Sequence, residues 1–463
     1  MALIRDEPFI LTPIDNILPR YYVSKLFLFP SSRSVATTDT IEALTSGLEK
    51  TVQAFPLLAG TVDEIQPATS QEQRGRLCVS APWHTMSEMF SVEDLTTNHA
   101  LDYSELRAAG FPIHKFDAAT LLPQETQSGL YARCVMLVKV NKIKGGLIVV
   151  HSLSHGFMDG GGMAVVVKIW AAFCRGEDGA RYLTPEVLDR SHLMHGKIGS
   201  EVADFPELTH ARQDPPAQTS TPGKKQELQY ETFFFSRQML AELKTMASVT
   251  KSHSRSNDWI STSDALCALI THCIKGTLRE RTRLTLGLAM DFRSYLDPPL
   301  PADYIGNAVH MLRMPLPQSD QEDDQQSLGR TAHLIRQKIQ TINDDYILRV
   351  IGALNSRSLP DISKVFHTRT CLNDGQFLTI TSWAKQEFYE LNWGSAVGTR
   401  IERVRMCKFQ YPNLVLIAPM FKGPGFSEEE AGGIEVVFGL KEVAMSRLKE
   451  NRLLERFARW EGK

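Results

Sequence analysis

The segment 145–163, GGLIVVHSLSHGFMDGGGM, holds the residues best suited to chemistry. His155, Asp159 and Gly160 form the pattern H-x-x-x-D-G, which follows an expected strand and precedes an expected helix. An imidazole titrates near neutral pH, so a histidine held in one tautomer can remove a proton from a hydroxyl group. A nearby carboxylate can shape such a site, and glycines at 160–162 allow a ligand or the backbone to approach closely. A lone histidine beside a strand is often structural, but this combination favours a general base.

A metal site is the main alternative for the same residues. His151, His155 and Asp159 are spaced i, i+4, i+8, which on a helix would put all three on one face. The preceding GLIVV is typical of a strand, however, where positions four apart are separated by about 13 Å. The glutamate of an H-E-x-x-H zinc motif is also absent. The sequence therefore predicts that no metal is bound.

Other catalytic signatures are missing from the chain. It contains no G-x-S-x-G nucleophile elbow, no G-x-x-x-x-G-K-[ST] phosphate loop and no G-x-G-x-x-G dinucleotide fingerprint. A covalent serine mechanism, nucleotide hydrolysis and hydride transfer therefore have no support.

Elements around the motif are expected to position it. Apolar residues at helical spacing predict a helix over 39–55, begun by Asp39 or Thr40. A strand is expected after Gly60. Residues 131–153 are typical of two strands joined by a Lys-Gly-Gly turn, and 163–174 of a buried helix.

The second half repeats the alternation of helices and strands. Residues 196–228 hold four prolines and little periodicity, which is typical of a crossover between domains. Ser236 is expected to cap one helix, and the S-x-x-D sequence from Ser261 to begin another. Further expected elements are a helix at 326–343, strands at 413–419 and 432–440, and a terminal helix. The pattern predicts two α/β layered domains, 1–195 and 229–463, joined by 196–228.

Composition narrows the class of protein. A chain of 463 residues exceeds what one hydrophobic core usually organises. A net charge of -2 lacks the basic excess that nucleic acids or anionic membranes require, so neither is an expected partner. There is no apolar run long enough to span a bilayer. The cysteines are odd in number, scattered and without C-x-x-C spacing, which predicts a reduced, cytoplasmic protein. They are Cys78, Cys134, Cys174, Cys267, Cys273, Cys371 and Cys407.

Five motifs in order resemble the BAHD acyltransferases, which use coenzyme A thioesters to acylate alcohols or amines. Besides H-x-x-x-D-G, they are FPLLAG (55–60), ISTSDALCALI (260–270), DFRSYLDPPLPADYIGN (291–307) and TSWAKQEFYELNWG (381–394). The last keeps only Trp393-Gly394 of the family's D-F-G-W-G. In this divergence the chain resembles the fungal members of the family, the trichothecene and alkaloid acetyltransferases. We expect Trp393 to be a packing residue.

This resemblance implies a fold of the chloramphenicol acetyltransferase type, with two similar layered α/β domains and an active-site tunnel between them. It implies that His155 is the base and that Asp159 points away from the substrate and pairs with Arg293, with Gly160 beside them. It further implies that Thr381 and Trp383 line the reaction centre, where the indole N–H can donate to the developing oxyanion.

Coenzyme A phosphates need cationic or hydrogen-bonding partners. Lys251, Arg255 and Ser263 are the candidates, with Lys224 and Lys225 as further basic residues, although solvent-exposed charge is the usual role of any one of them.

The predicted protein is a monomeric acyltransferase that acts on a small-molecule hydroxyl in specialised metabolism. Acyl-CoA, with acetyl-CoA favoured, is the co-substrate, and no permanently bound cofactor is expected. An amine acceptor and a condensation-type domain remain alternatives. The latter usually has a second histidine where Ser154 stands. A non-catalytic protein on this fold would be expected to lose His155 or Asp159, and both are present.

Overall fold

The structure of the protein is a computed structural model. The structure describes residues 7–31, 35–66, 73–127, 133–210, 228–249, 259–278, 284–316, 324–367, 377–398, 400–407 and 413–462.

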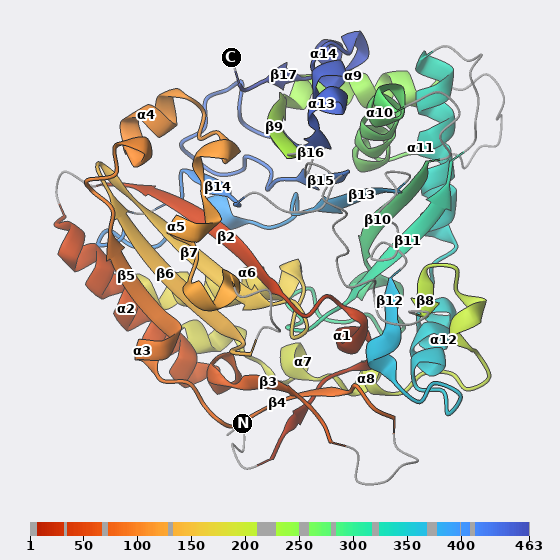
Figure 1. Ribbon diagram of the computed structural model, residues 1–463, viewed down its shortest axis with the longest axis horizontal. Coiled ribbons are helices and arrows are strands. Elements are labelled where there is room, and N and C mark those ends of the chain that lie inside the picture. Colours follow the sequence, from red (N-terminus) through yellow and green to blue (C-terminus); the bar gives the residue numbers. More distant parts are fainter. Residues whose placement is uncertain are drawn as a thin grey trace, which may run out of the picture.

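Two large sheets organise the fold (Figure 1). A five-stranded sheet has the order β14 (Arg403–Arg405), β2 (Tyr22–Pro30), β7 (Gly146–Ser154), β6 (Met136–Ile143) and β5 (Phe90–Asp94). A seven-stranded sheet has the order β11 (Val309–Pro315), β10 (Thr285–Asp291), β13 (Phe377–Ser382), β15 (Leu414–Ile417), β16 (Ile434–Lys441), β9 (Leu228–Phe235) and β17 (Arg459–Trp460). The smaller sheets are β1 (Phe9–Ile10), β4 (Leu77–Ser80) and β3 (Thr61–Glu64), and β12 (Val365–His367) with β8 (Leu208–His210).

The helices divide between the two halves of the chain. Those of the first half are α1 (Pro13–Ile17), α2 (Thr37–Ala54), α3 (Met86–Met89), α4 (Tyr103–Ala108), α5 (Ala118–Leu121), α6 (Gly160–Cys174), α7 (Pro185–Leu188) and α8 (Ser191–Met194). Those of the second half are α9 (Arg237–Ser248), α10 (Thr262–Thr277), α11 (Asp324–Gln340), α12 (Asp344–Leu354), α13 (Glu442–Lys449) and α14 (Arg452–Phe457). Figure 1 shows α9, α10, α11, α13 and α14 grouped around the seven-stranded sheet.

Strands β2 and β7 of the five-stranded sheet are covered on both faces. On β2 and β7, Phe27, Phe29 and Val149 pack in one core with residues of α2 and α6. The alternate positions, including Leu28 and Val150, pack in another core with residues of α4 and α5. Because side chains alternate along a strand, a strand covered on both faces is buried at every position, as β7 is.

The two halves share secondary structure. Strand β14 comes from the second half of the chain but pairs antiparallel with β2, where Val404 lies opposite Phe27. Of the segment 196–228, residues 211–227 lie outside the described residues, whereas β8 pairs antiparallel with β12. The fold is therefore a pair of layered α/β halves, and strand β14 of the second half completes the five-stranded sheet of the first (Figure 1).

Several predicted elements are confirmed. The β6–β7 hairpin turns at Lys144 and Gly145, and β3 follows Gly60. Ser236 caps α9, and Ser261 forms a capping box at the start of α10.

Other predicted boundaries were wrong. The helix expected to begin at Asp39 begins at Thr37, with Ala36 at its N-cap and no side-chain cap. The helix expected from 163 already begins at Gly160, because the Asp159 side chain caps its first turn. The terminal helix is two short helices followed by β17, which returns to the sheet beside β9.

Candidate active site

Strand β7 delivers His155 to the point where the chain turns into α6. The His155 N–H donates to the carbonyl of Tyr21 at 3.0 Å, and Nδ2 of Asn307 donates to the His155 carbonyl at 2.9 Å. The ring of Tyr21 stands edge-on to the imidazole, with centroids 6.1 Å apart. The His155 backbone is thus held from both halves of the chain, while its side chain is only partly buried.

Asp159 caps α6. Its Oδ1 accepts hydrogen bonds from the N–H groups of Gly161 (2.9 Å) and Gly162 (3.0 Å). A carboxylate at this position satisfies backbone donors that have no partner within the helix and is favoured by the helix dipole. The aspartate of the motif is therefore already engaged by its own helix.

Arg293 completes the shell around Asp159. Its Nη1 and Nη2 donate to the two carboxylate oxygens at 2.9 and 2.8 Å, and the Ala308 N–H donates at 2.8 Å. Burial opposes ionisation of Asp159, but the charge of Arg293 and these hydrogen bonds prevail and hold its pKa below the ordinary value. This is the pair that the family resemblance implied. Both partners are buried, so the carboxylate of Asp159 is shielded from solvent.

The two Nη atoms of Arg293 have further partners. Nη2 also donates to the carbonyls of Tyr304 (3.0 Å) and Gly306 (3.3 Å), and Nη1 to Asp291 (3.1 Å). The N–H of Asp159 donates to the Gly306 carbonyl at 3.3 Å. These contacts join the turn between β7 and α6 to the segment between β10 and β11.

A second buried ion pair supports the same turn, and the sequence reasoning missed it. Arg190 pairs with Asp15, and its Nη2 donates to the Phe157 carbonyl at 2.8 Å. Asn307, which holds the His155 carbonyl, also donates to Asp15 at 2.8 Å. Asp15 and Arg190 are 175 residues apart, so no local pattern pointed to them.

Gly160 allows the second half to approach the start of α6. A Cβ at this position would lie 2.3 Å from Nε2 of Gln386 and 3.7 Å from Cδ1 of Trp383. The Gln386 N–H donates to the Trp383 carbonyl at 2.8 Å, which closes a turn over the glycine. The predicted residues Gly160 and Trp383 therefore lie side by side.

Trp383 and Thr381 lie at the end of β13. Thr381 is half-buried and pairs across the sheet with Leu416. Trp383 is buried, and its backbone N–H donates to the Ile417 carbonyl at 2.8 Å. The indole borders a cavity of about 10 Å³, close to the minimum for one water molecule. That cavity is lined by Ile113, Trp383, Val404, Arg405, Met406, Leu416, Ala418, Pro419 and Val437.

A lysine that sequence reasoning overlooked lies against this indole. The side chain of Lys25, on β2, is fully buried, and its Nζ is 4.6 Å from the centroid of the Trp383 ring. The available signal was a single cationic residue before the apolar run Leu26–Pro30, at a position that alternation places on the α6 face.

The residues proposed for coenzyme A are only partly described. Ser263 is exposed in the first turn of α10, next to Asp264, which pairs with Arg336 at 2.5 Å. Lys224, Lys225, Lys251 and Arg255 lie outside the described residues.

Trp393 packs as expected. It is fully buried, and its ring stands edge-on to those of Trp170 (5.1 Å) and Phe29 (5.4 Å). The indole of the divergent D-F-G-W-G element therefore belongs to the core of the first half.

His151 belongs to the interior of β7 rather than to a metal site. It is fully buried, and burial followed by the charge of Lys25 lowers its pKa to about 3, so the imidazole is neutral. No group of three metal-ligating side chains occurs within the described ranges.

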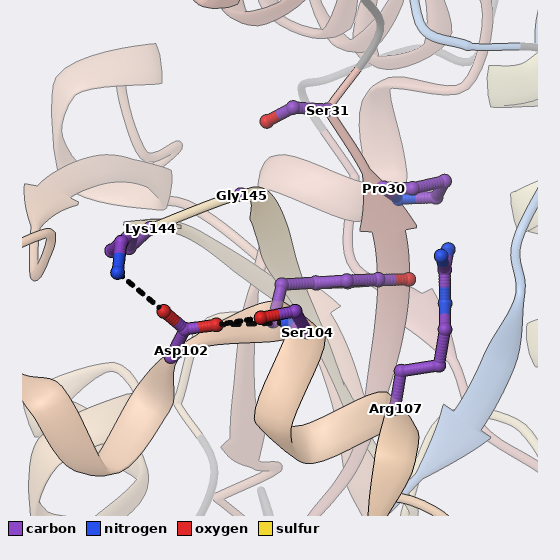
Figure 2. A pocket seen from close by; sticks show the side chains of 8 residues that line it. Pro30, Ser31, Asp102, Ser104, Arg107, Lys144 and Gly145 are labelled. Carbon is purple, nitrogen blue, oxygen red and sulfur yellow. Dashed lines mark hydrogen bonds and ion pairs between the residues drawn. The ribbon is translucent and has the colours of Figure 1, made fainter.

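A surface pocket is lined by residues of α4 and of the turn between β6 and β7 (Figure 2). It includes Gly145, just before the opposite end of β7, and is therefore roughly 33 Å from His155 along the strand. Its cations are engaged, since Arg107 pairs with Glu402 and Lys144 with Asp102 at 2.8 Å. We therefore do not assign it to the reaction.

None of the described helices is both long enough and apolar enough to cross a membrane.

Comparisons with known proteins identify the family of the chain. The model of the Transferase family matches residues 101–454, more than half of the chain, and that of the trichothecene 3-O-acetyltransferase-like N-terminal domain matches 21–174. The chain is 26% identical to trichothecene 3-O-acetyltransferase TRI101 of Fusarium sporotrichioides, over 95% of this chain and 94% of that protein. It is 25% identical to eremophilane O-acetyltransferase prx11 of Penicillium rubens, over 96% and 97% of the two chains.

Solved structures share the fold. TRI101 of F. sporotrichioides, complexed with coenzyme A and T-2, superposes with a TM-score of 0.80 at 23% identity, covering 99% of this chain and 100% of that one. Vinorine synthase superposes with a TM-score of 0.61 at 18% identity, covering 100% and 96%. The layered α/β architecture of the chloramphenicol acetyltransferase type is therefore present. The chain belongs to the Transferase family of BAHD-type, coenzyme A-dependent acyltransferases.

Proposed function

We propose that this enzyme transfers an acyl group, with acetyl preferred, from coenzyme A to the hydroxyl group of a small molecule of specialised metabolism, and that His155 is the general base. One observation carries the assignment of the base. Asp159 accepts five hydrogen bonds and is paired with Arg293, so it has no capacity left for a substrate proton. His155 is the partly exposed titratable group of the same turn.

The reaction proceeds without an acyl-enzyme. His155 removes the proton of the acceptor hydroxyl, and the oxygen attacks the thioester carbonyl carbon. The tetrahedral oxyanion receives a hydrogen bond from the indole N–H of Trp383. As the carbon–sulfur bond breaks, the coenzyme A thiolate leaves and takes the proton back from His155. Thr381 borders this centre from the end of β13.

The preference for acetyl rests on the relatives. The trichothecene and eremophilane enzymes are named O-acetyltransferases, and each aligns with at least 95% of this chain. The motif residues and the fold support the same class of reaction. We further propose that Ser263, Lys251 and Arg255, at and before the start of α10, contact the coenzyme A phosphates.

The test uses the purified full chain with acetyl-CoA and a panel of alcohols and matched amines. Thiol release is followed with a chromogenic disulfide, and the products are identified by mass spectrometry. We expect acetyl esters and a fall in kcat of about two to four orders of magnitude for His155→Ala, the usual contribution of a general base. Acetyl amides without esters would favour an amine acceptor. Unchanged turnover by His155→Ala would refute the assignment of the base.

A further inference from the structure

Lys25 stands where the two halves meet beside the proposed reaction centre. It lies on β2 opposite His151 of β7, on the face that packs against α6. Its Nζ is 3.3 Å from Sδ of Met163, in the first turn of α6. The same Nζ lies 4.6 Å from the ring centroid of Trp383 and 5.8 Å from that of Phe388. The first half thus places an amine on the aromatic face of the second.

This amine lacks the partners that buried cations normally have. The Lys25 side chain is fully buried, and a thioether sulfur is only a weak acceptor. Within the part of the chain that the structure describes, no carboxylate forms an ion pair with it. An aromatic face attracts a cation within about 6 Å of its centroid, and the attraction is strongest where water is excluded. The indole of Trp383 and the more distant charge of Asp159 therefore both act against the cost of burying the ammonium group.

Three of the described segments lie around Lys25, and two of them bring a charged or titratable group. His151 faces it from β7 and is neutral. Asp159, at the start of α6, is the anion that acts on Lys25, and it is neutralised by Arg293. The segment of the second half that covers the amine presents the rings of Trp383 and Phe388. Burial is therefore the main influence on the pKa of Lys25.

We propose that Lys25 is a positioning residue for acyl transfer: its ammonium group, held against the Trp383 ring, fixes the indole and strengthens the indole N–H as a donor to the oxyanion. A cation over the π face draws electron density from the ring, which makes the N–H a stronger donor. The effect is lost when the amine is deprotonated. The inference rests on the proposed donor role of Trp383.

The pH dependence follows from the surroundings of the amine. Burial lowers the pKa of Lys25 to about 7, although the charge of Asp159 acts in the opposite direction. The general base must be unprotonated, so activity rises with pH on the acidic side. Loss of the Lys25 proton weakens the indole donor, so kcat should fall as the pH rises through about 7.

The main experiment compares the kcat profile of the wild type with that of Lys25→Met from pH 5.5 to 9.5. Methionine keeps most of the aliphatic length without the charge. We expect kcat to fall about tenfold at pH 6, by the loss of one strengthened donor, and the alkaline decline to disappear. The KM for acetyl-CoA should change less than twofold, because the oxyanion exists only after attack. Lys139→Met is the matched control, since Lys139 lies on β6 of the same sheet and pairs with Glu93 at 2.5 Å; its profile should match the wild type.

A second readout does not depend on activity. In protein labelled with ¹⁵N-tryptophan, the indole N–H resonance of Trp383 is assigned by its absence in Trp383→Phe. It should shift with pH in the wild type and stay constant in Lys25→Met. Thermal unfolding of Lys25→Met should occur at the same temperature or higher, because removing an unpaired buried charge relieves a desolvation penalty.

Several results would overturn the inference. These are an unchanged alkaline limb in Lys25→Met, an indole resonance that titrates identically in both proteins, or losses of activity and stability that run in parallel at every pH. A wild-type protein without acyl transfer would instead contradict the proposed function, and the indole titration would still test the contact.

Discussion

The Asp159–Arg293 pair offers a quantitative test of how the motif turn is held. We consider Asp159→Asn, Arg293→Met and the double variant. Asparagine keeps the shape of Asp159 but removes its charge and replaces one acceptor with an NH₂ donor. It leaves Arg293 buried, with Asp291, whose side chain is half-exposed, as its remaining anion.

The contacts of Asp159 and Arg293 determine how much each substitution lowers the free energy of unfolding. Removing one partner of a buried ion pair typically costs about 3–5 kcal/mol, and the residual contact to Asp291 places Asp159→Asn near the lower end, about 3 kcal/mol. Arg293→Met leaves Asp159 with the N–H groups of Gly161, Gly162 and Ala308, so about 2–3 kcal/mol is expected. Because each single variant already loses the mutual contact, the double variant should be about 2 kcal/mol less destabilised than the sum.

The assay is urea unfolding at pH 7.5, followed by tryptophan fluorescence, with kcat measured on the same samples. The folded-state pKa of Asp159 is lowered, so its contribution is complete above the unfolded value of about 3.9 and is lost as the pH falls through the folded value. The measurement at pH 7.5 therefore records the whole effect. Both single variants should also lower kcat, because the turn that carries His155 is loosened.

A matched control is the exposed ion pair in which Nζ of Lys197 lies 2.6 Å from Oδ1 of Asp345. Asp345→Asn should leave the urea midpoint almost unchanged, because solvent screens this exposed pair. If Asp159→Asn and Arg293→Met add within about 0.5 kcal/mol, the two residues are not coupled and the reasoning is refuted.

Three further outcomes are expected. Trp383→Phe deletes the indole N–H and should lower kcat by about tenfold with little change in KM; a rise in KM alone would identify a substrate contact instead. Gly160→Ala places a Cβ 2.3 Å from Nε2 of Gln386 and should lower both activity and Tm, and adding Gln386→Ala should restore much of the loss if this clash is the cause. Prolonged treatment with a chelator should leave activity unchanged, and recovery of a lost activity by added Zn²⁺ would revive the metal interpretation.

Local patterns determined a large part of this protein. The β6–β7 hairpin could be predicted because a Lys-Gly-Gly turn between apolar runs is a short-range signal, and the caps at Ser236 and Ser261 depend on neighbours three residues away. The H-x-x-x-D-G motif was visible for the same reason. The pairing of Asp159 with Arg293, 134 residues away, was expected only through the family resemblance.

The tertiary structure decided how the site is supported. The pair of Asp15 and Arg190 has no local signature, because its partners become neighbours only when α1 and α8 meet at the turn after β7. In the sequence alone, Lys25 is a charged residue at the edge of an apolar strand. It becomes a buried cation on Trp383 only because β2 pairs with β7, α6 covers that face and the end of β13 closes over it. Spacing along the chain reports local geometry, whereas burial and the partners of a charge depend on contacts between distant segments.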